Sequence, residues 1–113
     1  MQTINAFDAP EMKNPHKVSA RKLLDFKHAL VIMLDIKPHE TLFPHITPVD
    51  VFFYILDGEG EVKIGEEVEQ VKKDDIVFSP AKMVHLLRNH HDEANFRVLV
   101  VKTPKPTSET KLL

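Results

Sequence analysis

Histidines are the residues of this chain with the widest choice of chemistry. The 113-residue sequence holds seven histidines and no cysteine, which excludes disulfides, thiolate nucleophiles and cysteine-based metal sites. His45 begins the stretch HITPVDVFFYILDGEG, an apolar run that ends in a glycine-containing turn. An imidazole there is either half of a metal site or a hydrogen-bonded histidine at a sheet edge. No G-x-S-x-G elbow, glycine-rich phosphate loop or H-E-x-x-H motif offers competing chemistry.

The elements that must position these histidines are short apolar runs bounded by turn residues, without helical spacing. This pattern predicts an all-β fold, a sandwich or barrel of eight strands. A helix at Ala20 to Leu30 is the alternative, and the continuous ALVIML run argues against it. The predicted strands are Val18 to Leu24, His28 to Ile36, Val51 to Leu56, Glu61 to Ile64, Val68 to Val71, Ile76 to Ser79, Met83 to Arg88 and Phe96 to Lys102.

Alternation along the strands predicts which side chains face the interior. If His45 faces inward, so do Val51, Phe53 and Ile55, which leaves Phe52, Tyr54 and Leu56 on the other face. These outward residues are large and apolar, and other strands are also apolar on both faces. We therefore expect a homodimer that packs sheet against sheet; a monomer covered by its N-terminal segment is the alternative.

The length and net charge of the chain limit the number of domains and the kinds of binding partner that we expect. The length suits one domain, residues 1–113, with a core at about 17–103 and a flexible tail at 104–113 that contains Pro104 and Pro106. A formal charge of −2 gives no reason to expect binding to nucleic acid or an anionic membrane. The N-terminus lacks a signal-peptide pattern and no apolar run reaches membrane-helix length, so we expect a cytoplasmic protein.

Two spaced motifs of this chain resemble those of the cupin family, G-x5-H-x-H-x3-E-x6-G and G-x5-P-x-G-x2-H-x3-N. Both spacings are met without a gap between His39 and Asn89. The matching residues are His45, Gly58, Pro80, His85 and Asn89, and the phrases IKPHETLFPH and FRVLVVKTPKP are also similar to small cupins. The resemblance implies a double-stranded β-helix, or jelly-roll, barrel. It leaves the activity open, because the family includes enzymes, sensors and storage proteins.

The same resemblance implies a divalent ion of Fe, Mn, Ni, Cu or Zn, held by three histidines and a glutamate. In this chain His45 and His85 match two of those ligands, whereas Thr47 and Val51 occupy the other two positions. Threonine is a poor ligand and valine offers none, so a bound ion would be held weakly. Asp50 could replace the carboxylate only through a bulge, because neighbouring strand residues point to opposite faces. The alternative is a pair of buried neutral histidines without an ion.

The remaining positions suggest a small-molecule site. Phe53 and Met83 share the parity of the two histidines and should line the cavity with them, and Thr47 and Asn89 are further candidates for ligand contact. Lys82 is either a cation at the barrel mouth or a solvated rim lysine. A small, mainly apolar cavity with two histidines favours a partly apolar organic ligand.

Three functions therefore stay open. The first is a small-molecule-binding cupin without assured catalysis. The second is a metal-dependent dioxygenase or isomerase of a small carbonyl or carboxylate substrate. The third is a barrel whose histidines serve only folding.

Overall fold

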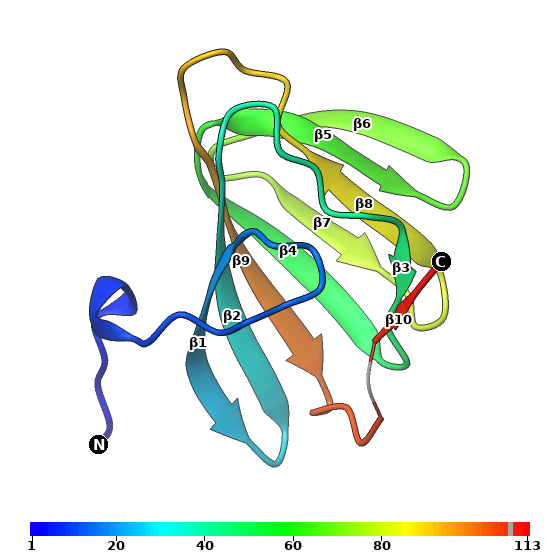
Figure 1. The fold of residues 1–113 in the computed structure, drawn as a ribbon. Coiled ribbons are helices and arrows are strands. Elements are labelled where there is room, and N and C mark those ends of the chain that lie inside the picture. Colours follow the sequence, from blue (N-terminus) through cyan, green and yellow to red (C-terminus); the bar gives the residue numbers. More distant parts are fainter. Residues whose placement is uncertain (109) are drawn as a thin grey trace.

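Ten strands and one short 3-10 helix make up the computed structural model, which describes residues 1–108 and 110–113. The strands form two five-stranded sheets with the orders β1-β2-β9-β4-β7 and β10-β3-β8-β5-β6. Figure 1 shows these sheets facing each other, with the N-terminal segment beside β1 and the C-terminus beside β3. The element bounds are η1 (Ala6–Asp8), β1 (Ser19–Phe26), β2 (Ala29–Ile36), β3 (His45–Ile46), β4 (Asp50–Asp57), β5 (Glu59–Ile64), β6 (Glu67–Lys72), β7 (Ile76–Ser79), β8 (Val84–Arg88), β9 (Phe96–Thr103) and β10 (Lys111–Leu112).

The eight strands predicted from the sequence are all present, within a few residues of the expected bounds. The alternative helix at Ala20 to Leu30 is absent, because those residues form the β1–β2 hairpin, in which Phe26 pairs with Ala29. Strand β3 went unpredicted because Pro44 and Pro48 limit it to two residues. All pairings among the described strands are antiparallel, so the architecture is the jelly-roll barrel expected from the motifs.

Side chains alternate across the sheets as predicted. In β4, Val51, Phe53 and Ile55 are buried, whereas Phe52, Tyr54 and Leu56 are only partly covered. The inward residues of both sheets form one apolar core between them. This core fixes the registers of β3, β8 and β9, the strands that carry the polar residues of the interior.

The tail beyond Thr103 is extended at its end, where β10 pairs with β3. Leu112 lies opposite His45 in this pairing, and the backbone N–H of Leu113 donates to the Pro44 carbonyl at 3.1 Å. From the sequence we expected a flexible tail at 104–113, without this pairing. The tail therefore contributes to the barrel beside the histidines.

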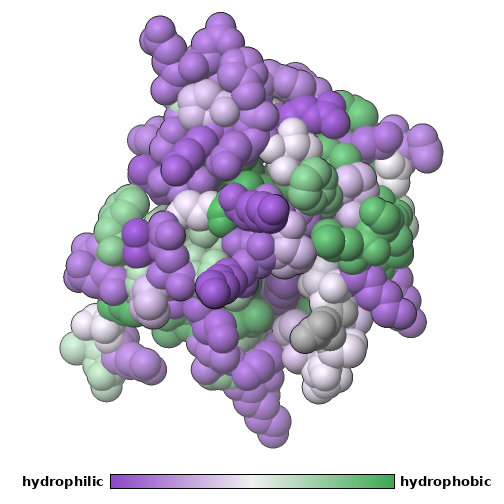
Figure 2. Space-filling model, viewed as in Figure 1, coloured by the Kyte–Doolittle hydropathy of each residue, from purple (hydrophilic) through white to green (hydrophobic). Residues whose placement is uncertain are grey.

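Among the described residues, no helix is long and apolar enough to cross a membrane. Figure 2 shows one face of the molecule, on which hydrophobic side chains are set between more numerous hydrophilic ones.

Candidate functional site

His45 and His85 are direct cross-strand neighbours at the centre of the candidate site. Strands β3 and β8 pair in a register that sets the two residues opposite each other. Their ring centroids lie 4.2 Å apart with an interplanar angle of 88°, and the side chains are almost buried, with 7% and 2% of their surfaces exposed. Phe53 packs edge-on to His85, with 5.4 Å between the ring centroids. The structure thus brings together three residues that the sequence placed in the cavity.

A third histidine, His16, joins the pair from the N-terminal loop. Its ring centroid lies 4.7 Å from that of His45. Asn14 holds this loop, because its Oδ1 accepts from the His16 backbone N–H at 3.1 Å and its Nδ2 donates to the Val18 carbonyl at 2.8 Å. Sequence reasoning missed His16, since it lies outside both motifs and in no predicted strand. No sequence pattern distinguished His16 from its polar neighbours Asn14 and Lys17.

The backbone of Phe43 assigns opposite tautomers to two of the rings. Its N–H donates to Nδ1 of His16 at 2.9 Å, so a neutral His16 carries its proton on Nε2. Its carbonyl lies 2.7 Å from Nδ1 of His45, which must donate, so a neutral His45 keeps a lone pair on Nε2. The Phe43 side chain itself is half exposed. The Phe43 backbone therefore leaves His16 with a hydrogen-bond donor at Nε2 and His45 with an acceptor at Nε2.

All three rings are held in the neutral form at pH 7. Burial lowers the pKa of His16 to about 4, with His45 and Lys102 as further causes. Burial likewise lowers the pKa of His85 to about 3, with electrostatic repulsion from His45, Lys102 and His16 as further causes when those groups are protonated. Burial also lowers the pKa of His45, against the opposing effect of the Phe43 carbonyl. Neutral imidazoles in a shared cavity can accept or donate a hydrogen bond without bringing a charge.

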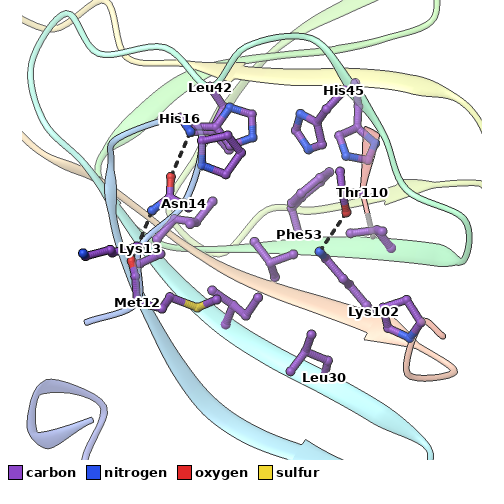
Figure 3. A pocket seen from close by; sticks show the side chains of 18 of the residues that line it. Met12, Lys13, Asn14, His16, Leu30, Leu42, His45, Phe53, Lys102 and Thr110 are labelled. Carbon is purple, nitrogen blue, oxygen red and sulfur yellow. Dashed lines mark hydrogen bonds between the residues drawn. The ribbon is translucent and has the colours of Figure 1, made fainter. Parts of the chain in front are cut away.

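The histidines line a cavity of about 460 Å³ between the two sheets. Figure 3 shows the labelled side chains around it: His16 and Met12 come from the N-terminal loop, and Lys102 and Thr110 from the C-terminal part of the chain. Most of the remaining wall is apolar: Ala20, Leu30, Ile32, Leu34, Leu42, Val51, Phe53 and Val100. A cavity of this size and composition suits a small organic molecule.

Lys102 brings a positive charge to this apolar cavity. In β9 it pairs with Leu30 on one side and with Val51 on the other, so its side chain faces inward with theirs. Its Nζ donates to Thr110 Oγ1 at 3.3 Å, a contact that Figure 3 also shows. Burial lowers the pKa of Lys102 because the ammonium loses solvation. Sequence reasoning passed over Lys102 as the end of an ordinary strand.

Met83 and Asn89 do not lie where the sequence placed them. Met83 is 39% exposed and outside the cavity wall, because β8 begins only at Val84 and strand parity does not extend to the turn before it. Asn89 is buried, but its amide donates to the carbonyls of Ile36 and Ala94 at 3.0 and 2.9 Å, and its Oδ1 accepts from the His91 N–H at 2.9 Å. These bonds give Asn89 a structural role, because they tie the β8–β9 loop to the end of β2.

The other candidates from the motifs do not line the cavity. Thr47, expected to contact a ligand, is buried outside the cavity wall, with its Oγ1 3.5 Å from Thr110 Oγ1. Asp50 is exposed and its Oδ1 accepts from the Ala81 N–H at 2.8 Å, so it does not join the histidines. Lys82 is exposed and outside the cavity wall, as a solvated rim lysine would be.

The described residues do not fit a four-ligand metal centre. No group of three or more His, Asp or Glu side chains within residues 1–108 and 110–113 is arranged to hold a metal ion. His45 and His85 are nitrogen donors, but the two other positions hold Thr47 and Val51. The Lys102 ammonium lines the same cavity and would repel a second cation.

Comparisons with known proteins agree with this fold. The family model described as the Cupin domain matches residues 32–102. The uncharacterized protein SCO3923 of Streptomyces coelicolor is 31% identical over 71 residues, which are 63% of this chain and 64% of that protein. The match thus spans less than two thirds of that relative's length.

Solved structures resemble the whole chain. The polyketide cyclase RemF of Streptomyces resistomycificus superposes with a TM-score of 0.84 at 18% identity, covering 100% of this chain and 85% of RemF. The protein TT1209 of Thermus thermophilus gives 0.80 at 25% identity, covering 94% of this chain and 100% of the other. A predicted oxalate decarboxylase of Thermotoga maritima gives 0.77 at 18% identity, covering 99% and 100%. Because the family model covers more than half of a chain with this barrel fold, the protein belongs to the cupin family.

Proposed function

We propose that the protein binds a small, partly apolar organic molecule in the barrel cavity and needs no metal ion to do so. One observation carries this proposal: a cavity of about 460 Å³ has a mainly apolar wall on which a few polar groups, His16, His45, His85 and Lys102, converge. Apolar area supplies binding free energy, and a small number of polar groups orients the ligand. Catalysis is not part of this proposal.

The histidines retain unused hydrogen-bonding capacity toward a ligand. In the described part of the chain, two buried side-chain atoms lack a hydrogen-bond partner, Asp35 Oδ1 and Arg97 Nε. No histidine nitrogen is among these buried atoms without a partner. The hydrogen bonds of His45 and His85 use Nδ1, with Ser79 Oγ 3.0 Å from that atom of His85. Their Nε2 atoms are therefore accessible to a molecule that enters the cavity.

A fragment screen followed by amide chemical-shift mapping tests this function. We expect hits that shift the amides around His45, Phe53 and His85. Ala20→Leu, which adds three carbons to the cavity wall, should weaken those hits, and the dispersion of its spectrum reports whether it folds. Hits confined to the outer surface, or hits that Ala20→Leu leaves unchanged, would refute binding in the cavity.

A metal-dependent enzyme is the second candidate, and the 4.2 Å approach of His45 to His85 is the observation that favours it. Two imidazoles alone would hold a divalent ion weakly and leave open positions for a substrate's oxygens. Metal content of tag-free protein at neutral pH distinguishes the candidates. Near-stoichiometric metal that is lost in the His45→Ala, His85→Ala double variant would favour the enzyme over the metal-free binding protein.

A further inference from the structure

Among the described residues, all the charged side chains that line the cavity are positively charged. Its wall includes Lys13 and Lys102 and the three histidines, and no Asp or Glu. Lys13 is exposed at the rim, whereas Lys102 is the inward-facing cation. Within the described chain, no carboxylate lies in ion-pair distance of Lys102 Nζ. The cavity is thus electrically suited to a negatively charged guest.

The ammonium of Lys102 has donors to spare. It carries three N–H groups, and among residues 1–108 and 110–113 Nζ has one hydrogen-bond acceptor, Thr110 Oγ1 at 3.3 Å. A buried charge that lacks hydrogen bonds costs free energy, which a bound anion would recover. A carboxylate offers up to four lone pairs and can accept more than one of these donors.

His16 supplies a second kind of donor at the same cavity. Because its Nδ1 accepts from the Phe43 N–H, its neutral ring has the remaining proton on Nε2. Figure 3 shows His16 and Lys102 on different sides of the cavity, on the N-terminal loop and on β9. A guest between them can therefore be held by its charge at one end and by a neutral donor at the other.

The rest of the wall selects for an apolar body. Leu30 is the cross-strand neighbour of Lys102 on β2, and Val51 is its neighbour on β4. Ile32 and Val100 line the same cavity. Aliphatic side chains beside the ammonium would leave a polyol or a free phosphate with unsatisfied hydrogen-bonding groups. They would instead gain free energy by covering an aromatic or branched aliphatic group.

We propose that the ligand is a small monocarboxylate with an apolar body, whose carboxylate binds the Lys102 ammonium inside the barrel. This inference rests on the proposed function, because it names the ligand class for the same cavity. The Lys102 side chain then supplies the positive charge that makes the cavity specific for an anionic ligand.

Benzoate, its neutral analogue benzamide and inorganic phosphate form a probe set that separates charge from apolar contact. Binding to the full chain is followed by amide chemical shifts and calorimetry at pH 7.5. We expect benzoate to bind in the cavity at least ~10-fold more tightly than benzamide, the effect of one charge-assisted hydrogen bond. Phosphate, which lacks an apolar body, should be weaker than benzoate by a similar factor, ~10-fold.

Matched variants assign the preference to one side chain. Lys102→Met keeps an unbranched chain but removes the charge, so the preference for benzoate over benzamide should disappear while benzamide binding stays. Lys102→Arg should keep the preference. Lys82→Met, at an exposed lysine outside the cavity wall, should change neither affinity by more than ~2-fold, as expected for an exposed charge.

The outcomes separate this inference from the proposed function. If benzamide binds in the cavity as well as benzoate, or if Lys102→Met keeps the preference, the anion inference is wrong and cavity binding stands. Phosphate binding as tight as benzoate binding would refute the apolar body. If none of the probes and no fragment shifts the cavity amides, both the inference and the proposed function are overturned.

Discussion

At the scale of single residues, the cavity holds histidines whose proton states are set by their surroundings. His45 and His85 were identifiable because the spacing of the two motifs resembles that of the cupin family, and the β3–β8 register then sets them opposite each other. His16 and Lys102 were not, since their positions depend on how a loop and a strand end fold over the barrel. The sequence could therefore identify the residues that the motifs mark. It missed Lys102, although its strand was predicted, because no motif marks that position. Met83 shows the same limit, because parity was extended to a residue outside the strand.

The buried histidines should make the protein sensitive to acid. His85 has a pKa of about 3 in the folded chain against 6.5 as its ordinary value, so the unfolded chain binds more protons between these limits. Stability is then full above about pH 6.5 and falls as the pH drops toward 3. Between pH 7.5 and pH 5, His85 alone should cost ~2 kcal/mol of the free energy of unfolding. Urea unfolding at both pH values measures this loss.

Two variants identify His85 as the source of this pH dependence. His85→Gln cannot titrate, so the difference in unfolding free energy between pH 7.5 and pH 5 should shrink by ~2 kcal/mol, whatever the variant's stability at pH 7.5. His39→Gln is the control, since His39 is exposed and bonds to Asp92 at 2.8 Å. An equal pH dependence in wild type and His85→Gln would contradict the assignment.

At the scale of elements, turns set the positions of the strands around the site. Several of these turns contain non-glycine residues with positive φ angles. His39, Asp74 and Lys82 stand at the motif positions where cupins have glycine, and their φ angles are 65°, 74° and 67°. The chain thus keeps the left-handed turn conformation without the residue that adopts it most readily. Asp74 is helped by the Tyr54 hydroxyl, which donates to its Oδ1 at 2.9 Å. These turns were predictable because the glycine positions of the motifs mark them. Strands β3 and β10 were not predictable, because a two-residue strand shows no alternation in the sequence.

Lys82→Gly should stabilise the protein. The side chain is exposed and the backbone bond from its N–H to the Thr47 carbonyl, 2.9 Å, needs no side chain. Removing the Cβ relieves the left-handed strain and should raise the free energy of unfolding by roughly 0.5–1 kcal/mol, after the added chain entropy is subtracted. Lys73→Gly, at a residue of the β6–β7 turn whose own φ is not positive, should instead lower it. Urea denaturation of both variants decides, and a Lys82→Gly variant no more stable than wild type would refute the strain argument.

At the scale of the whole molecule, the outer face of the β1-β2-β9-β4-β7 sheet is covered unevenly. Toward β2 and β9, the Arg97 guanidinium lies 4.9 Å from the Phe7 ring centroid, and Met33 is only 2% exposed. Toward β7, Ile76 and Phe78 are 64% and 61% exposed. The N-terminal segment therefore contacts this face through Phe7, whereas the β7 side remains exposed and apolar.

We expect a second copy of the chain to cover the β4–β7 half of this face. Phe78 pairs with Phe52 and Ile76 with Tyr54, so four large side chains form one continuous outward patch. Strand β7 is also the edge of its sheet, which suits pairing between copies. Light scattering at micromolar concentration should give a mass near twice 13.0 kDa, and Phe78→Asp should reduce it to one chain with the fold intact. Val68→Asp, an exposed apolar position on the opposite sheet, should stay dimeric. A single-chain mass for the wild type would mean that the patch is simply solvated or binds something other than this chain.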